Sequence, residues 1–159
     1  MAHSRAAGWL VSLLGLVACG GGGGVEINPE REVVANRWNA ILATPSQLAG
    51  VVQIKGTGWM MGDEKDPGET IAFVSIANAV PGGEHPWHVH LGRCGVDRGI
   101  FGPAQNYRVL QVDGKGRAEA KAELAVPAPS AGEYFINVHA SVNNMRTILA
   151  CGNLAPPSR

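Results

Sequence analysis

The sequence predicts an all-β domain, a sandwich or barrel of about eight short strands. Apolar and polar residues alternate with a period of two in many short segments, which is typical of half-buried strands. Gly, Pro, Asn and Asp cluster between these segments and predict turns at regular intervals. Long stretches with the periodicity of an amphipathic helix do not occur in the chain.

The first strand is expected at 38–43, and the second at 51–54 with an extension towards residue 60. Residues 62–68 combine acids, Pro and Gly and therefore predict a turn. The segment 70–77 is apolar on both of its alternating faces, which predicts a strand buried on more than one side.

Residues 80–83 end this strand, and the next one covers 87–91. Strands at 107–112 and 118–126 flank a turn whose residues tolerate positive φ angles, so they are expected to pair as a hairpin. The last strands are expected at 134–139 and 147–151. Two segments leave a helical alternative open. Residues 117–124 are rich in alanine, although their alternation with charged residues favours a strand, and a short helix is possible within 30–41.

The N-terminal residues 1–18 have the composition of a secretory signal peptide, with one Arg, no acid and a short apolar run. The run ends in Leu16-Val-Ala-Cys19, which resembles the lipobox of bacterial lipoproteins, where the cysteine is acylated. We expect a lipidated cysteine and a Gly-rich tether in residues 19–36, the domain in 37–155, and a short tail in 156–159. We therefore expect export and a lipid anchor in the bacterial cell envelope; ordinary cleavage with a free Cys19 is the alternative.

The chain has three cysteines, an odd number that needs an explanation in an exported protein. Lipidation of Cys19 accounts for one of them and leaves Cys94 and Cys151 to pair in an oxidising compartment. Two free thiols are the alternative. The disulfide would close a loop of about 57 residues, which is worth about 4 kcal/mol in the chain-entropy model.

Charge excludes some classes of function. The sequence has 13 basic and 13 acidic residues and no basic run, so nucleic acid is not an expected partner. Neither a Ser/His/Asp set nor a glycine-rich phosphate loop is present.

The most informative segment is His85-Pro-Trp-His88-Val-His90. Residues two apart on a strand project from the same face, so His88 and His90 can share one metal ion. A third imidazole from another strand, with His139 as the candidate, would complete a three-nitrogen site with an open position. Copper is the favoured metal because divalent copper has the highest affinity for nitrogen sites.

The order of these residues and of the later motifs along 38–154 resembles that in the copper/zinc superoxide dismutases. The matching motifs are His85-x-x-His88-x-His90 with Gly92 and Cys94, Val138-His139, and Leu149-Ala-Cys151-Gly152. The resemblance implies an eight-stranded Greek-key β-barrel, copper ligands at His88, His90 and His139, and a Cys94–Cys151 disulfide. It also implies a structural role for His85, which would hydrogen-bond to the backbone.

The sequence departs from this family after the His-x-His pair. Family members bind zinc through a long loop with a bridging histidine, whereas 91–106 is short and lacks histidine. Its only acid, Asp97, cannot hold zinc alone. We therefore expect one copper ion and no zinc.

The sequence also differs from the family in the arginine and the charged loop that act on superoxide. The family's catalytic arginine stands three residues before the second cysteine, which is Ile148 here, and the nearest arginine is Arg146. The offset of two residues is about 6.6 Å along a strand, so Arg146 is a candidate catalytic residue only. The connection 140–146 is short, and the charged loop that guides superoxide in the family is largely missing.

Two functions follow from the resemblance and its departures. The first is copper-dependent disproportionation of superoxide, an oxidoreductase activity, and the second is copper binding or buffering by a lipid-anchored protein without turnover. A metal-free domain is a third alternative. The expected partners are superoxide or copper ions and, through the lipid, the membrane; the sequence leaves the oligomeric state open.

Overall fold

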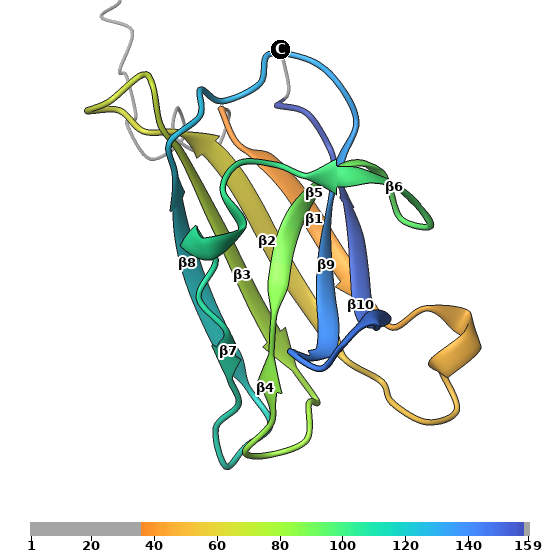
Figure 1. Ribbon diagram of the computed structural model, residues 1–159. Helices are drawn as coiled ribbons and strands as arrows, with labels where there is room; N and C mark the ends of the chain where they lie inside the picture. Colours follow the sequence, from red (N-terminus) through yellow and green to blue (C-terminus); the bar gives the residue numbers. More distant parts are fainter. Residues whose placement is uncertain (1–35, 158–159) are drawn as a thin grey trace, which may run out of the picture.

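The structure, a computed structural model, describes residues 36–157, which form two antiparallel sheets (Figure 1). The larger sheet has eight strands in the order β6-β5-β9-β10-β1-β2-β3-β8, and the smaller one pairs β4 with β7. This architecture confirms the predicted all-β class. The strands are β1 (Trp38–Ala43), β2 (Lys55–Gly62), β3 (Thr70–Ala77), β4 (Glu84–His85), β5 (Trp87–Arg93), β6 (Val96–Ile100), β7 (Leu110–Gln111), β8 (Ala118–Leu124), β9 (Tyr134–Ser141) and β10 (Asn144–Leu154).

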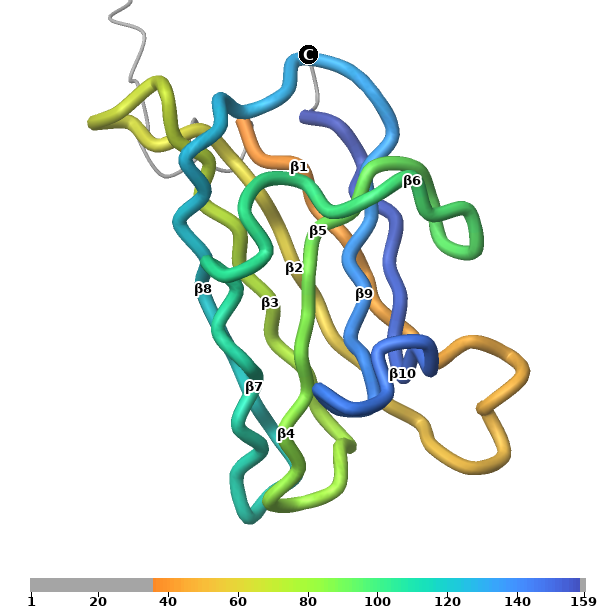
Figure 2. The backbone as a smooth tube through the Cα atoms, in the orientation of Figure 1, coloured from red at the N-terminus to blue at the C-terminus, as the bar shows by residue number. Residues whose placement is uncertain are grey.

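The large sheet curls into a half-barrel around one apolar core. Figure 2 shows β8, β3 and β2 on one side of the curl and β5, β9 and β10 on the other. Connections from β3 to β5 and from β8 to β9 run between distant positions in the sheet, as they do in a Greek key. Fully buried side chains from both sides fill the interior, among them Leu42, Met60, Val74, Val89 and Ile136.

The gap between the end strands β6 and β8 is bridged by a connecting segment, residues 101–107. The Phe101 N–H donates to the carbonyl oxygen of Val89 at 2.8 Å, and the Tyr107 hydroxyl donates to the carbonyl oxygen of Phe101 at 2.6 Å. On the opposite side, the Asn106 side-chain amide donates to the carbonyl oxygen of Glu123 in β8 at 2.6 Å. The segment therefore covers the core where the end strands do not pair.

Several predicted strands are confirmed. The first strand and the strand at 70–77 have the predicted bounds, and 118–124 is a strand rather than a helix. Residues 38–41 are extended, so the helical alternative is wrong for that part of 30–41. Predictions for residues 1–35, including the signal peptide, the lipidated Cys19 and most of the tether, lie outside the described residues.

Three details of the strand prediction are wrong. Residues 51–54 lie outside β2 because the N–H groups of Val51 and Val52 both donate to the carbonyl oxygen of Leu48, closing a turn after a short 3-10 helix (Ser46–Leu48). The hairpin of 107–112 with 118–126 does not form. Instead β7 pairs with β4, and β8 pairs with β3 along its whole length. The sequence prediction also missed β6, whose region it assigned to a loop.

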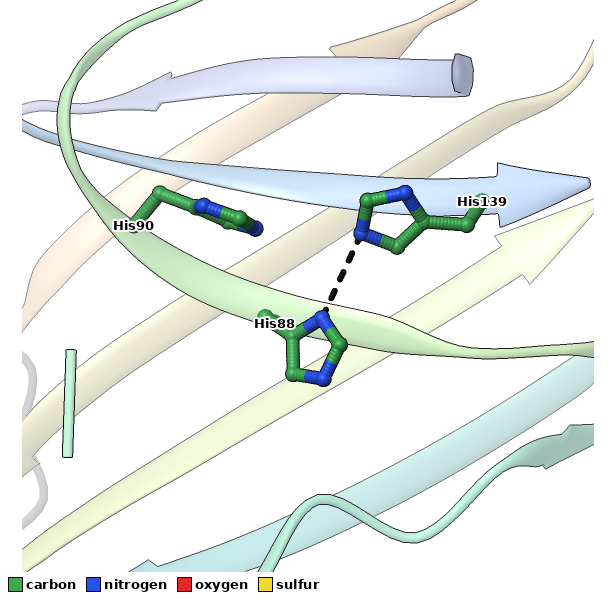
Figure 3. Close-up of side chains that lie close together, drawn as sticks. All are labelled: His88, His90 and His139. Atoms are coloured by element: carbon green, nitrogen blue, oxygen red, sulfur yellow. Dashed lines mark hydrogen bonds between the residues drawn. The ribbon is translucent and has the colours of Figure 1, made fainter. Parts of the chain in front are cut away.

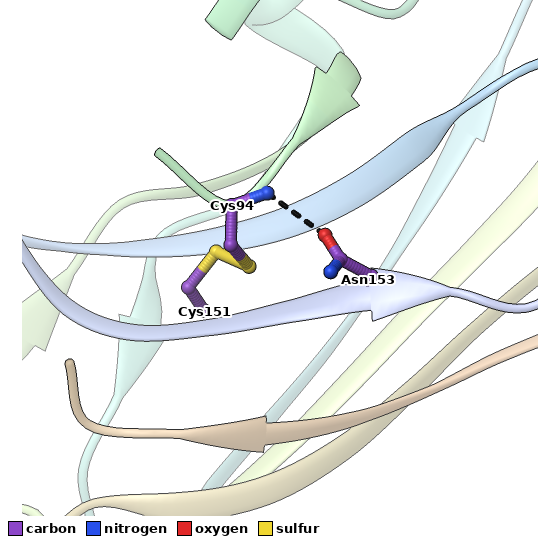
Figure 4. Close-up of a disulfide and its surroundings, with 3 residues drawn as sticks. All are labelled: Cys94, Cys151 and Asn153. Carbon is purple, nitrogen blue, oxygen red and sulfur yellow. Dashed lines mark hydrogen bonds between the residues drawn. A yellow bond between two sulfur atoms is a disulfide. The ribbon is translucent and has the colours of Figure 1, made fainter. Parts of the chain in front are cut away.

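A disulfide joins the β5–β6 hairpin to β10 (Figure 4). It connects Cys94 and Cys151, which are 57 residues apart in the sequence. The backbone N–H of Cys94 also donates to the side-chain oxygen of Asn153 at 2.8 Å. Two independent links therefore hold this hairpin to β10, although β9 separates β5 from β10 in the sheet.

We expect the Cys94→Ala/Cys151→Ala double variant to lose up to about 4 kcal/mol of unfolding free energy, because its denatured chain is no longer cross-linked. Urea unfolding of both proteins measures the difference. Asn153→Ala is the control for the hydrogen bond at the same place and should cost only about 1 kcal/mol. A double variant as stable as the wild type would contradict the expectation.

Candidate metal centre

Three histidines from two neighbouring strands form a cluster (Figure 3). His88 and His90 lie on β5, and His139 lies on β9. Side-chain alternation directs Val89 and Val138 into the core and the histidines to the opposite face of the strands. The histidines are nevertheless buried, with 4 to 7% of their surface exposed.

The three rings can offer ligand nitrogens to one centre, because one nitrogen from each lies within 4.8 Å of the other two. The Nδ1 of His139 lies 2.7 Å from the carbonyl oxygen of Met145. A carbonyl oxygen only accepts, so this nitrogen carries the proton and the Nε2 of His139 carries a lone pair. That Nε2 lies 3.3 Å from the Nδ1 of His88.

His90 supplies the clearest sign of a ligand site. Its Nδ1 lies 3.0 Å from the Asp97 carboxylate, so Nδ1 holds the proton and donates it. Its Nε2 is buried and has no hydrogen-bond partner. A buried polar atom without a partner costs free energy and calls for an explanation such as a bound ion. With the proton of His88 on Nε2, all three nitrogens that face the centre carry lone pairs, which fits a metal ion.

The electrostatics of the cluster favour the protonation states that metal binding requires. The pKa of His88 is lowered from 6.5 to about 4, mainly by burial and also by the neighbouring His139 and His90, whereas Asp97 acts in the opposite direction. Burial also lowers the pKa of His139, although its hydrogen bond to the Met145 carbonyl acts in the opposite direction. His88 and His139 are therefore neutral at pH 7, which is the state that a metal ligand needs.

For Asp97, the contacts of the side chain outweigh the effect of burial on its pKa. Burial tends to raise the pKa of this carboxyl, but the Gly99 N–H and the His90 ring hold it below its ordinary value. The side chain is therefore an anion at pH 7. Sequence reasoning considered Asp97 only as an insufficient zinc ligand and missed its contact with His90. The signal that could have found it is a carboxylate in a Gly-flanked segment directly after the strand that carries His90.

The other predicted site residues lie around the cluster. The Nδ1 of His85 lies 2.9 Å from the carbonyl oxygen of Ala140, so this buried ring contacts backbone and is not part of the three-histidine group. Arg146, Asp97 and His139 line one open surface pocket, which the disulfide also borders. The structure thus brings Arg146 to the pocket that leads to the cluster.

Comparison with known proteins finds no matching family model and no matching curated protein. The fold and the site define an all-β protein with a three-histidine group that could hold a metal ion. The resemblance to a particular family therefore rests on the motifs alone. No helix among residues 36–157 has the length and apolar character needed to cross a membrane.

We expect the metal-free protein to lose stability as the pH falls from about 6.5 towards 4. In this range the unfolded chain protonates His88 and the folded chain does not, so proton uptake favours unfolding. Urea midpoints measured at pH 7 and pH 4.5, in the presence of a chelator, report the change.

The matched variant is His88→Gln, which lacks the titrating group. Its midpoint should fall less between the two pH values than that of the wild type. Equal decreases in the two proteins would show that His88 does not contribute.

Proposed function

We propose that this protein is an exported copper protein of the superoxide dismutase type, which converts superoxide into dioxygen and hydrogen peroxide. The observation that carries the proposal is the buried group of His88, His90 and His139, with its unpartnered His90 nitrogen. The order of the histidine and cysteine motifs along an all-β chain gives further support.

Copper is the metal that this donor set favours. Divalent copper has the highest affinity of the common divalent ions for imidazole nitrogens, and three such ligands leave a position open for a small molecule. When bound, copper supplies one-electron chemistry, and two superoxide ions and two protons give one dioxygen and one hydrogen peroxide.

The protein's own groups would hold the ligands and admit the substrate. The Met145 carbonyl and the Asp97 carboxylate each accept a hydrogen bond from the outer nitrogen of a ligand ring and so keep its inner nitrogen directed at the centre. Arg146 lines the open pocket beside His139, where a guanidinium can attract an anion such as superoxide. The protons come from water in this pocket.

The proposed location is the bacterial cell envelope. The Cys94–Cys151 disulfide supports an oxidising compartment, since such bonds are rare in the cytosol. A lipid on Cys19 would attach the domain to the membrane through the tether 20–36, and the sequence supports this part of the proposal.

Copper binding or buffering without turnover is the second candidate function. It is favoured by the charges of the pocket, since Asp97, with 53% of its side chain exposed, lies in the same pocket as Arg146. A carboxylate there offsets the attraction of the arginine for an anionic substrate.

The first test is superoxide removal by protein loaded with one equivalent of copper. We expect His139→Ala to lower the rate at least ten-fold, because two imidazoles hold the ion in the wrong geometry. The wild type loaded with zinc, which has no redox chemistry, is the control and should be inactive. If the wild type binds copper but is no faster than these two, the binding function replaces the enzymatic one.

The second test concerns the pocket. We expect Arg146→Ala to lower kcat/KM for superoxide several-fold at low ionic strength, with a smaller effect at high salt and unchanged copper affinity. Arg117→Ala is a suitable control because Arg117 lies in the β7–β8 connection, where it pairs with Asp113. An effect of Arg146→Ala no larger than that of the control would exclude Arg146 from substrate attraction.

A further inference from the structure

We propose that Asp97 is a positioning residue that acts through His90 to make the metal centre favour divalent over monovalent copper. This inference rests on the proposed copper site and deepens it, since it concerns the relative stability of the two copper states. The residue is not one of the three ligands, and its effect would reach the metal through the imidazole ring.

The contact is held by the β5–β6 hairpin. The Oδ1 atom of Asp97 accepts from His90 Nδ1 at 3.0 Å and from the Gly99 N–H at 2.8 Å. A change of register follows His90 in this hairpin, and Gly92 there has a φ of 106°, where a Cβ atom would clash with the Val96 carbonyl oxygen. This backbone conformation strongly favours glycine and places Asp97 opposite Gly92 in the ladder.

His90 and His139 differ in what their outer nitrogens contact. His139 donates to a neutral carbonyl, that of Met145, whereas His90 donates to a carboxylate. Hydrogen bonds to ionised acceptors are stronger than those to neutral ones. The His90 ring therefore receives more negative charge than the His139 ring.

The charge of Asp97 is not neutralised by the arginines beside it in the sequence. Arg93 and Arg98 both lie within ion-pairing distance of Glu133, at 4.0 and 3.9 Å. In the described part of the chain, His90 is the basic side chain that pairs with Asp97. Among the described residues, neither of these two arginines forms an ion pair with Asp97, whose carboxylate pairs with His90.

A carboxylate behind a ligand histidine raises the basicity of the ligand nitrogen, and loss of such a partner typically costs 10- to 100-fold in metal affinity. The interaction of a negative charge with a divalent ion is twice that with a monovalent ion at the same distance. Asp97 should therefore stabilise divalent copper more than monovalent copper and lower the reduction potential of the site.

The test compares full-length wild type with Asp97→Asn and Asp97→Ala. Asparagine keeps an oxygen that accepts from His90 and Gly99 but has no charge. Asp63→Asn is the matched control, because Asp63 likewise accepts backbone N–H groups, from Lys65 and Asp66, in the β2–β3 turn. Affinities for both copper states are measured by competition with chelators, and the potential by redox titration.

We expect Asp97→Asn to bind divalent copper at least ten-fold more weakly than wild type, with a smaller loss for monovalent copper. A ten-fold selective loss corresponds to a rise of about 59 mV in the potential of a one-electron couple. Asp97→Ala should show at least the same rise, and Asp63→Asn none.

Two results would overturn the inference. If Asp97→Asn matches wild type in potential and in both affinities while Asp97→Ala is weakened, Asp97 only shapes the hairpin. If the wild type binds no copper, the copper site and this inference both fail. A wild type that binds copper without removing superoxide overturns only the dismutase activity, and the potential of Asp97→Asn still decides the role of Asp97.

Discussion

The pairing of β5 with β9 is the interaction on which the rest of the site depends. It places His88 opposite Asn137 in the ladder, and the His139 N–H donates to the Pro86 carbonyl just beyond it. The same register directs the apolar residues that alternate with the histidines, Val89 and Val138, into the core. Core packing and the histidine cluster therefore require the same alignment of β5 with β9. A slip of one residue would exchange the two faces and remove both.

The β5–β6 hairpin and its disulfide add a second constraint. The hairpin brings Asp97 back to His90, and the disulfide fixes the same hairpin against β10. Cys94 and Asp97 of this hairpin line the pocket that also contains Arg146 and His139, so one short segment contacts His90 and forms part of the pocket. The cationic Arg146 and the anionic Asp97 thus line one pocket. Their relative effects decide whether the pocket attracts an anion or a cation.

Much of the fold could be predicted because alternation and turn residues are local signals. The strands 38–43 and 70–77 were found in this way, as was the same-face placement of His88 and His90. The turn at 51–54 was a local failure, whereas the failures at β6 and β8 were non-local. Which strand pairs with β8 depends on the closure of the barrel, and the Asp97 contact depends on a hairpin whose strand β6 is mostly exposed and has no apolar alternation. Such contacts leave little trace in the sequence.

In the proposed metal centre, one copper ion binds to His88, His90 and His139. Copper X-ray absorption of the protein loaded with one equivalent tests it most directly, because the scattering pattern of imidazole rings can be counted and distinguished from that of sulfur. We expect three imidazole ligands in the wild type and two in His139→Ala. Sulfur ligation, or an unchanged imidazole count in that variant, would contradict it.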